Sequence, residues 1–148
     1  MGWTVFYKIK TEHPIQNVDT AEMERITAKW IPLLHEGCED IWFETVKGDK
    51  ASELFAAYDQ EGRFVPAEID PRCTYLWGFT KVQFSKEPPK DFVTVLRAMK
   101  ELALARPSWS IVVSDDYETT DGYDTGGSGN IKDIDLEAVA QSLSAQHF

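Results

Sequence analysis

Residues 73 to 84 read Cys-Thr-Tyr-Leu-Trp-Gly-Phe-Thr-Lys-Val-Gln-Phe, a run dominated by aromatic and β-branched side chains. Such side chains favour extended backbone because they pack well on the pleated surface of a sheet. The run therefore predicts one long strand, and further elements are expected on either side of it.

Three shorter runs predict the other strands. Residues 3–9, Trp-Thr-Val-Phe-Tyr-Lys-Ile, place apolar side chains at every second position, which is the period of a strand with one buried face. Residues 40–46 and 108–114 have the same character. The chain thus predicts four strands in all.

Two main helices are expected between these strands. The capping-box spacing of Asp19 and Glu22 predicts a first helix that begins near Thr20. A second begins at the double proline 88–89 and keeps one apolar face for four turns until Pro107. A short C-terminal helix is also predicted, and its apolar side consists of Leu136, Val139, Ala140 and Leu143.

The order strand, helix, strand, strand, helix, strand is typical of the α+β, ferredoxin-like βαββαβ sandwich. We therefore expect an antiparallel sheet with two main helices on one face, then an acidic Gly-rich loop and a short C-terminal helix. A doubly wound parallel sheet is the alternative, because residues 47–72 could hide a crossover helix. Within that segment, residues 51–58 fit either a short helix or one arm of a hairpin turning at Asp59 to Gly62, and we favour the hairpin.

Length and composition predict a single globular domain over residues 1–148, with 43% hydrophobic and 27% charged residues. The sequence has no apolar run long enough to span a bilayer and no visible signal peptide, so we expect no membrane association. Cys38 and Cys73 are the two cysteines, and without secretory context they suggest reduced thiols in the cytoplasm.

The formal net charge of −10 repels phosphate backbones and anionic lipid headgroups, which disfavours direct binding of nucleic acid. The charge is also unevenly placed. Residues 107–148 hold eight carboxylates and one lysine, for a net charge of −7, while residues 1–106 carry −3. The C-terminal third is therefore the acidic end of the chain.

That acidic end supports the first functional hypothesis, a non-catalytic protein-interaction module of the inhibitor, immunity or adaptor type. Electrostatic complementarity would speed encounter with a basic partner protein, and aromatic side chains would anchor the contact. The predicted partner-binding residues are Asp115, Asp116, Tyr117, Glu118, Asp121, Tyr123 and Asp124.

No catalytic residue, metal site or cofactor is assigned. The acidic loop lacks the Asp-x-Asp-x-Asp-Gly pattern of an EF-hand, so a solvated loop explains it better than a cation site. His35 and Cys38 form the only sequence-local Cys–His pair, but there is no second such pair for zinc and no third residue for catalysis. We therefore favour a non-catalytic protein, with an enzymatic role left as an alternative.

A second hypothesis places a small-molecule-binding or enzymatic site on an aromatic sheet face or in a dimer cleft. Five tryptophans are numerous for this length, and four of them lie on predicted strands. If one face of the sheet is uncovered, its aromatic side chains would form a binding surface. The residues predicted to line this site are Trp42, Tyr75, Trp77 and Phe79.

A third hypothesis comes from residues 77–84, Trp-Gly-Phe-Thr-Lys-Val-Gln-Phe. This octamer resembles part of the third-strand motif of RNA-recognition-motif domains, with agreement at Gly78, Phe79, Val82 and Phe84. The resemblance implies single-stranded RNA binding through the sheet, with Phe79 as the stacking residue and Phe6 as its neighbour. A basic stripe of Lys8, Lys10, Lys81 and Lys86 would favour it locally.

Overall fold

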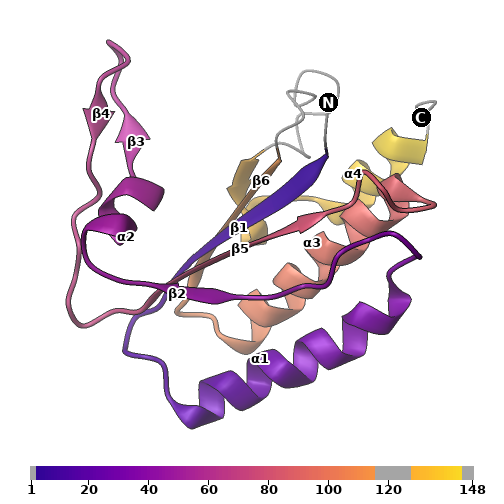
Figure 1. Ribbon diagram of the computed structural model, residues 1–148, viewed down its shortest axis with the longest axis horizontal. Coiled ribbons are helices and arrows are strands. Elements are labelled where there is room, and N and C mark those ends of the chain that lie inside the picture. Colours follow the sequence, from indigo (N-terminus) through magenta and orange to yellow (C-terminus); the bar gives the residue numbers. More distant parts are fainter. Residues whose placement is uncertain (1–2, 116–127, 145–148) are drawn as a thin grey trace.

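The computed structural model describes residues 3–115 and 128–144, and its centre is a five-stranded antiparallel sheet (Figure 1). The strands follow the order β2-β5-β1-β6-β7. Every neighbouring pair is antiparallel, so the alternative of a doubly wound parallel sheet is wrong. The strands are β1 (Thr4–Lys10), β2 (Glu44–Val46), β5 (Tyr75–Lys81), β6 (Ser110–Asp115) and β7 (Ser128–Asn130).

The described residues form four α-helices, and the two longest lie together on one side of the sheet (Figure 1). Helix α3 contacts α1 on one flank and α4 on the other. The predicted helix after the double proline and the predicted C-terminal helix are both confirmed. The four are α1 (Asn17–Trp30), α2 (Asp49–Leu54), α3 (Pro88–Ala105) and α4 (Leu136–Ser144).

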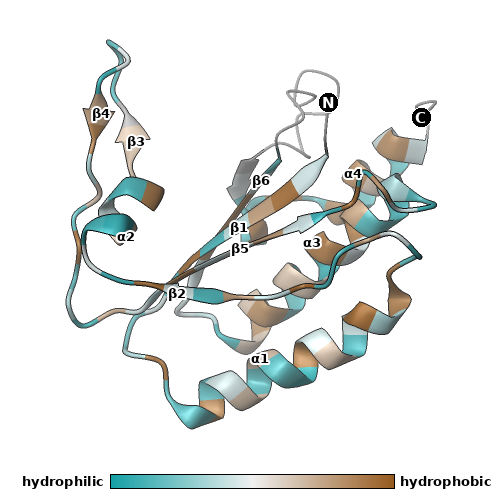
Figure 2. Ribbon diagram, in the orientation of Figure 1, coloured by the Kyte–Doolittle hydropathy of each residue, from teal (hydrophilic) through white to brown (hydrophobic). Residues whose placement is uncertain are grey.

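The core lies between the sheet and the two long helices. Alternate residues of β1 face it, and Val5, Tyr7 and Ile9 are fully buried. The apolar stripe of α3 meets them, which explains why a helix with a hydrophobic face on every turn packs here. Along α1 hydrophilic and hydrophobic residues alternate, as expected for a helix with one solvated side (Figure 2).

The start of α1 differs from the prediction. The helix begins at Asn17, three residues before Thr20, because Gln16 serves as the N-cap. The Asp19 carboxylate lies at the third helical position and accepts a hydrogen bond of 3.0 Å from the Gln16 amide. Asp19 is therefore the returning acceptor of a capping box rather than its first residue.

Residues 47–72 contain both structures that the sequence left open. Ala51 to Leu54 belong to helix α2, so the predicted hairpin arm is wrong for that part. Strands β3 (Ala57–Tyr58) and β4 (Phe64–Val65) then pair as a hairpin, and the Asp59 carboxylate accepts from the amides of Glu61 and Arg63 in its turn. The hairpin stands away from the main sheet, with hydrophobic strands and a hydrophilic tip (Figures 1 and 2). Among the described residues, no helix combines the length and apolar character needed to cross a membrane.

Candidate functional site on the open face of the sheet

One face of the main sheet lies opposite α1 and α3, and we call it the open face. Its side chains are set by strand register, because residues that point away from the core stand side by side on neighbouring strands. Phe6 pairs with Phe79, Lys8 with Trp77 and Lys10 with Tyr75. The residues on the open face include Thr4, Phe6, Lys8, Lys10, Glu44, Val46, Tyr75, Trp77, Phe79, Lys81, Ser110, Val112 and Ser114.

Four rings on this face form an aromatic cluster, which consists of Phe6, Trp42, Trp77 and Phe79. The Trp42 ring centroid lies 5.8 Å from that of Trp77 and 5.2 Å from that of Phe79. The Trp77 and Phe79 centroids are 5.6 Å apart, and those of Phe6 and Phe79 are 6.3 Å apart. These are the separations of interacting aromatic pairs, and all four residues keep part of their surface exposed.

Trp42 reaches the open face because the segment before β2 is anchored to the Tyr7 side chain of β1. The Tyr7 hydroxyl accepts a hydrogen bond of 3.1 Å from the Trp42 amide and lies 3.2 Å from the Thr80 hydroxyl. Burial raises the pKa of Tyr7 to about 12, so this hydroxyl stays protonated. Ile41 is buried in the core, and alternation along an extended chain turns Trp42 to the other side.

Three of the four residues predicted to line an aromatic site, Trp42, Trp77 and Phe79, are therefore brought together. Tyr75 differs, because it is only 4% exposed and the Phe55 ring lies 5.2 Å from its own. The Tyr75 hydroxyl accepts from the amide of Asp70 at 3.2 Å. Tyr75 thus supports the loop before β5 instead of presenting its ring to a ligand.

The open face also carries three lysines, Lys8, Lys10 and Lys81, which we call the face lysines. None of them forms an ion pair with another described residue. The Lys8 ammonium lies 5.9 Å from the centroid of the Phe55 ring, and the Lys10 ammonium lies 5.9 Å from that of Tyr75. Partial burial lowers the pKa of Lys8, because desolvation disfavours its charged form.

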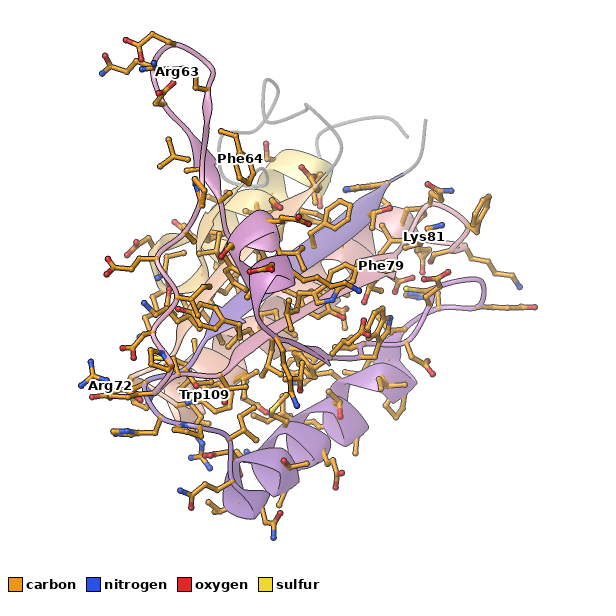
Figure 3. All side chains as sticks on the ribbon, turned by 60° about the vertical axis from the view of Figure 1, so that its left-hand side comes forward. Arg63, Phe64, Arg72, Phe79, Lys81 and Trp109 are labelled. Atoms are coloured by element: carbon orange, nitrogen blue, oxygen red, sulfur yellow. The ribbon has the colours of Figure 1, made fainter. Side chains whose placement is uncertain are left out.

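Lys86, the fourth lysine of the predicted basic stripe, lies elsewhere. Its ammonium is 2.9 Å from the Glu36 carboxylate, in the loop before α3. Figure 3 shows Phe79 and Lys81 on β5, apart from Arg63 and Phe64 on the projecting hairpin. The positive charge of the open face therefore comes from β1 and β5.

A cavity of about 320 Å³ lies at the end of the open face that carries Lys8 and Lys10, and we call it the sheet pocket. The sheet forms its floor, while the segments on both sides of the β3–β4 hairpin form its roof. Its lining consists of Lys8, Lys10, Tyr75, Ser110 and Val112 from the sheet, and Phe55, Ala56, Ala67 and Glu68 from the roof.

A larger cavity, of about 600 Å³, lies between the N-terminal half of α3 and α4. Its rim is cationic, but those charges already have partners. Lys90 lies 2.9 Å from the Glu87 carboxylate, and Arg97 lies 4.0 Å from that of Glu137. Paired charges attract an additional anion weakly, so the smaller sheet pocket is the better candidate for a charged ligand.

At the edge of the larger cavity, His35 lies between two carboxylates. Its Nδ1 is 2.8 Å from the Asp91 carboxylate, and its Nε2 is 2.6 Å from that of Glu87. Asp91 is fully buried and also accepts from the His35 amide at 3.1 Å and from the Ser85 hydroxyl. This network fastens the loop after α1 to the first turn of α3.

Cys38 and His35 do not form an activated nucleophile. The Cys38 thiol lies 3.4 Å from the carbonyl oxygen of Glu39, not against the imidazole. Burial, together with the charge of Asp91, raises the pKa of Cys38 to about 12. A thiol with such a pKa is not ionised at neutral pH and is a poor nucleophile.

Of the predicted partner-binding residues, the structure describes Asp115. It ends β6, and its carboxylate accepts a hydrogen bond of 3.2 Å from the indole nitrogen of Trp3. The remaining predicted contacts lie outside the described residues, namely Asp116, Tyr117, Glu118, Asp121, Tyr123 and Asp124. Within the described part of the chain, His, Cys, Asp and Glu side chains form no group of three that could hold a metal ion.

Sequence reasoning missed the roof of the sheet pocket. Phe55 contacts both Tyr75 and Lys8, which lie far from it in sequence. No local pattern around residue 55 indicates such contacts, because they depend on how α2 folds back over β5. The sequence does indicate one part of the pocket, because the alternation along β1 places Lys8 and Lys10 on the same face of the sheet.

Comparisons with known proteins give no relative. No protein-family model, curated protein or solved structure matches the chain.

Proposed function

We propose that the protein binds a ligand on the open face of its sheet, and that this ligand carries a planar ring and a negative charge. One observation supports this above all others. The aromatic cluster lies beside three lysines that form no ion pair with another described residue. Aromatic rings favour planar apolar groups, and ammonium groups, of which that of Lys8 is partly desolvated, favour an anion.

The face lysines are distinguished by their common position beside the aromatic cluster and by the partial burial of Lys8. In a chain of net charge −10, all five arginines of the described region pair with a carboxylate, whereas three of its ten lysines do, namely Lys29, Lys86 and Lys90. Partial burial of an unpaired ammonium costs free energy, which a bound anion would recover. A second copy of the open face is a poor occupant, because a two-fold contact would bring like charges together.

The dye 8-anilino-1-naphthalenesulfonate tests this proposal, because it combines planar rings with one negative charge. Its neutral relative N-phenyl-1-naphthylamine serves as the matched probe. We expect the native protein to bind the anionic dye more tightly than the neutral dye. The variant Trp77→Ala should lose most of the fluorescence enhancement that the anionic dye shows with the native protein. Trp30→Phe, a change on α1, is the control and should bind normally. Equal binding by the native protein and Trp77→Ala would refute the proposal.

Single-stranded RNA is a second candidate ligand. Phe6 and Phe79 stand on neighbouring strands with ring centroids 6.3 Å apart, at the two positions that the RNA-recognition resemblance implies for stacking. Titration with oligouridine at low salt, followed by tryptophan fluorescence, tests this candidate. Absence of quenching at micromolar oligonucleotide would remove it.

The acidic-partner hypothesis is a further proposal, supported by the net charge of −7 over residues 107–148. An affinity pull-down at low and high salt tests it. The comparison is between the native protein and a variant with Asp115, Asp116, Glu118, Asp121 and Asp124 changed to Asn or Gln. We expect one basic protein to be recovered by the native chain alone and at low salt alone.

The finer features of the fold and location are also proposals. The strand order β2-β5-β1-β6 and the pairing of α1 with α3 support a ferredoxin-like arrangement, to which β7 adds an edge strand. We likewise propose a single domain over residues 1–148. Cys38 and Cys73 are both free thiols, which supports a cytoplasmic location.

A further inference from the structure

We infer that the ligand of the open face is a nucleoside monophosphate, with its phosphate in the sheet pocket between Lys8 and Lys10 and its base on the aromatic cluster. This inference rests on the proposed function and specifies the ligand class. It depends on the pocket, on the positions of the two lysines, and on the distance between pocket and cluster.

The sheet pocket is suited to a doubly charged group. Lys8 and Lys10 are two residues apart on β1, so both ammonium groups stand on the same face of the sheet, and both line the cavity. Ser110 lies directly opposite Lys10 on β6 and adds a hydroxyl donor. Two ammonium groups and a hydroxyl match the charge and the several acceptor oxygens of a phosphate dianion.

The carboxylate of the pocket has a separate role in this arrangement. Glu68 lines the roof and is an exposed residue. A carboxylate accepts hydrogen bonds from hydroxyl groups, and those of a ribose would lie between the phosphate and the base. The pocket therefore offers partners for the phosphate and for the ribose of a nucleotide.

The aromatic cluster lies one nucleotide away from the pocket. Trp77 is the direct cross-strand neighbour of Lys8, and Phe79 lies one row further along the face. The step from Lys10 to Trp77 is one strand spacing of about 4.8 Å and two residues of about 3.3 Å each. A base on Trp77 and a phosphate at Lys10 are thus within reach of one nucleotide.

The roof argues against a polynucleotide in the same place. Phe55 lies against both Tyr75 and Lys8, and Ala56 and Ala67 line the cavity beside it. A strand that continued past the phosphate along β1 would meet this roof. On the β2 side, Glu44 stands next to Trp77 and would repel a following phosphate.

Tryptophan fluorescence titrations with four probes test the inference: AMP, adenosine, inorganic phosphate and an eight-residue oligoadenylate. We expect AMP to bind at least roughly tenfold more tightly than adenosine, because it alone gains the charge-assisted bonds. Lys10→Met should lower AMP affinity at least roughly fivefold, because one of the two ammonium groups is lost while Lys8 and Ser110 remain, and it should leave adenosine affinity unchanged. Lys47→Met removes an exposed lysine outside the sheet pocket and should leave both affinities unchanged. Thermal unfolding of both variants verifies that they fold.

The outcomes separate this inference from the proposed function. Equal affinities for AMP and adenosine, or equal effects of Lys10→Met and Lys47→Met, would overturn the phosphate site while leaving an aromatic ligand surface. Oligoadenylate binding more than about tenfold tighter than AMP would overturn the mononucleotide assignment in favour of a polymer. If neither these probes nor the anionic dye bind, both proposals fail.

Discussion

The Tyr7 ring and the Cα of Gly78 face each other across β1 and β5, and a Cβ at Gly78 would overlap with that ring. The carbonyl oxygen of Trp42 occupies the other side of the same space. The absent side chain thus lets the chain before β2 cross β5 closely enough for the Tyr7 hydroxyl to bind the Trp42 amide. The position of Trp42 in the aromatic cluster depends on this contact.

Substitution of Gly78 should therefore destabilise the protein. Gly78→Ala forces the Trp42 segment or the Tyr7 ring to move, and overpacking of this kind costs roughly 1–3 kcal/mol or more. Val112→Ala, on the exposed face of β6, should cost under about 1 kcal/mol. Urea unfolding of the two variants and the native protein measures the difference. Similar urea-unfolding midpoints for Gly78→Ala and Val112→Ala would show that a methyl group fits beside Gly78 without displacing its neighbours.

The Tyr7 hydroxyl should produce a pH dependence of stability. Its pKa is about 12 in the folded protein and about 10 in the unfolded chain, so the folded state holds the proton more tightly. This stabilisation is complete below pH 10 and is lost as the pH rises towards 12. Tyr7→Phe should cost about 1–2 kcal/mol at pH 7, since the Trp42 amide loses its acceptor.

Urea unfolding of the native protein and Tyr7→Phe between pH 8 and pH 11 tests this dependence. The difference in unfolding free energy between the two should shrink above pH 10. A difference that stays constant to pH 11 would contradict the assigned environment of Tyr7.

The two cysteines should react at different rates. The Cys38 pKa of about 12 leaves little thiolate at pH 8. Desolvation also raises the pKa of Cys73, but Cys73 lines a cavity at the end of the sheet, where a reagent can reach its thiol. The variant Cys73→Ser should therefore react with iodoacetamide at least roughly tenfold more slowly than Cys38→Ser. In urea the two variants should react alike. Equal rates in the native state would mean that Cys38 is not shielded.

Asp91 should matter for stability and not for ligand binding. Asp91→Asn removes the charge that His35 and Ser85 contact in a fully buried position, and we expect a loss of about 2–4 kcal/mol. Glu87→Gln changes an exposed carboxylate of the same network and should cost under about 1 kcal/mol. Urea unfolding of both variants measures the loss of stability, and AMP titration measures whether ligand binding changes. A selective loss of AMP affinity in folded Asp91→Asn would place the site at the larger cavity instead.

The elements that sequence predicts well are those with strong local periodicity. Helix α3 repeats its apolar face over residues 92–103, and every residue of that predicted stripe is buried. Strand β1 likewise alternates in sequence as it does in the structure. In both cases one element faces one core, so the period alone specifies the buried side.

Strand β2 shows where local patterns fail. Residues 40–46 have the composition of a strand, yet only Glu44–Val46 pair with β5. The amide of Trp42 donates to the Tyr7 hydroxyl, and the carbonyl oxygen of Asp40 accepts from the Thr80 hydroxyl at 3.2 Å. Side chains on two other strands thus replace ladder hydrogen bonds, which cannot be read from residues 40–43 themselves.

The candidate site also has one part that local sequence patterns predict and one part that they do not. Alternation within single strands placed Trp77, Phe79 and two lysines of β1 on one face, and the structure brings them together. The roof of the sheet pocket needs α2 and the hairpin to fold back over β5, and short-range patterns contain no information on that packing. Aromatic surfaces can thus be predicted from strand sequences, while the pockets beside them depend on longer-range contacts.

The most direct test of ligand binding on the open face is a titration of the ¹⁵N-labelled protein with AMP, followed by amide chemical shifts. We predict shift changes concentrated in residues 6–10, 75–81 and 110–114, together with the indole signals of Trp42 and Trp77. Changes concentrated instead around His35, Arg97 and Leu143, at the larger cavity, would contradict this proposal.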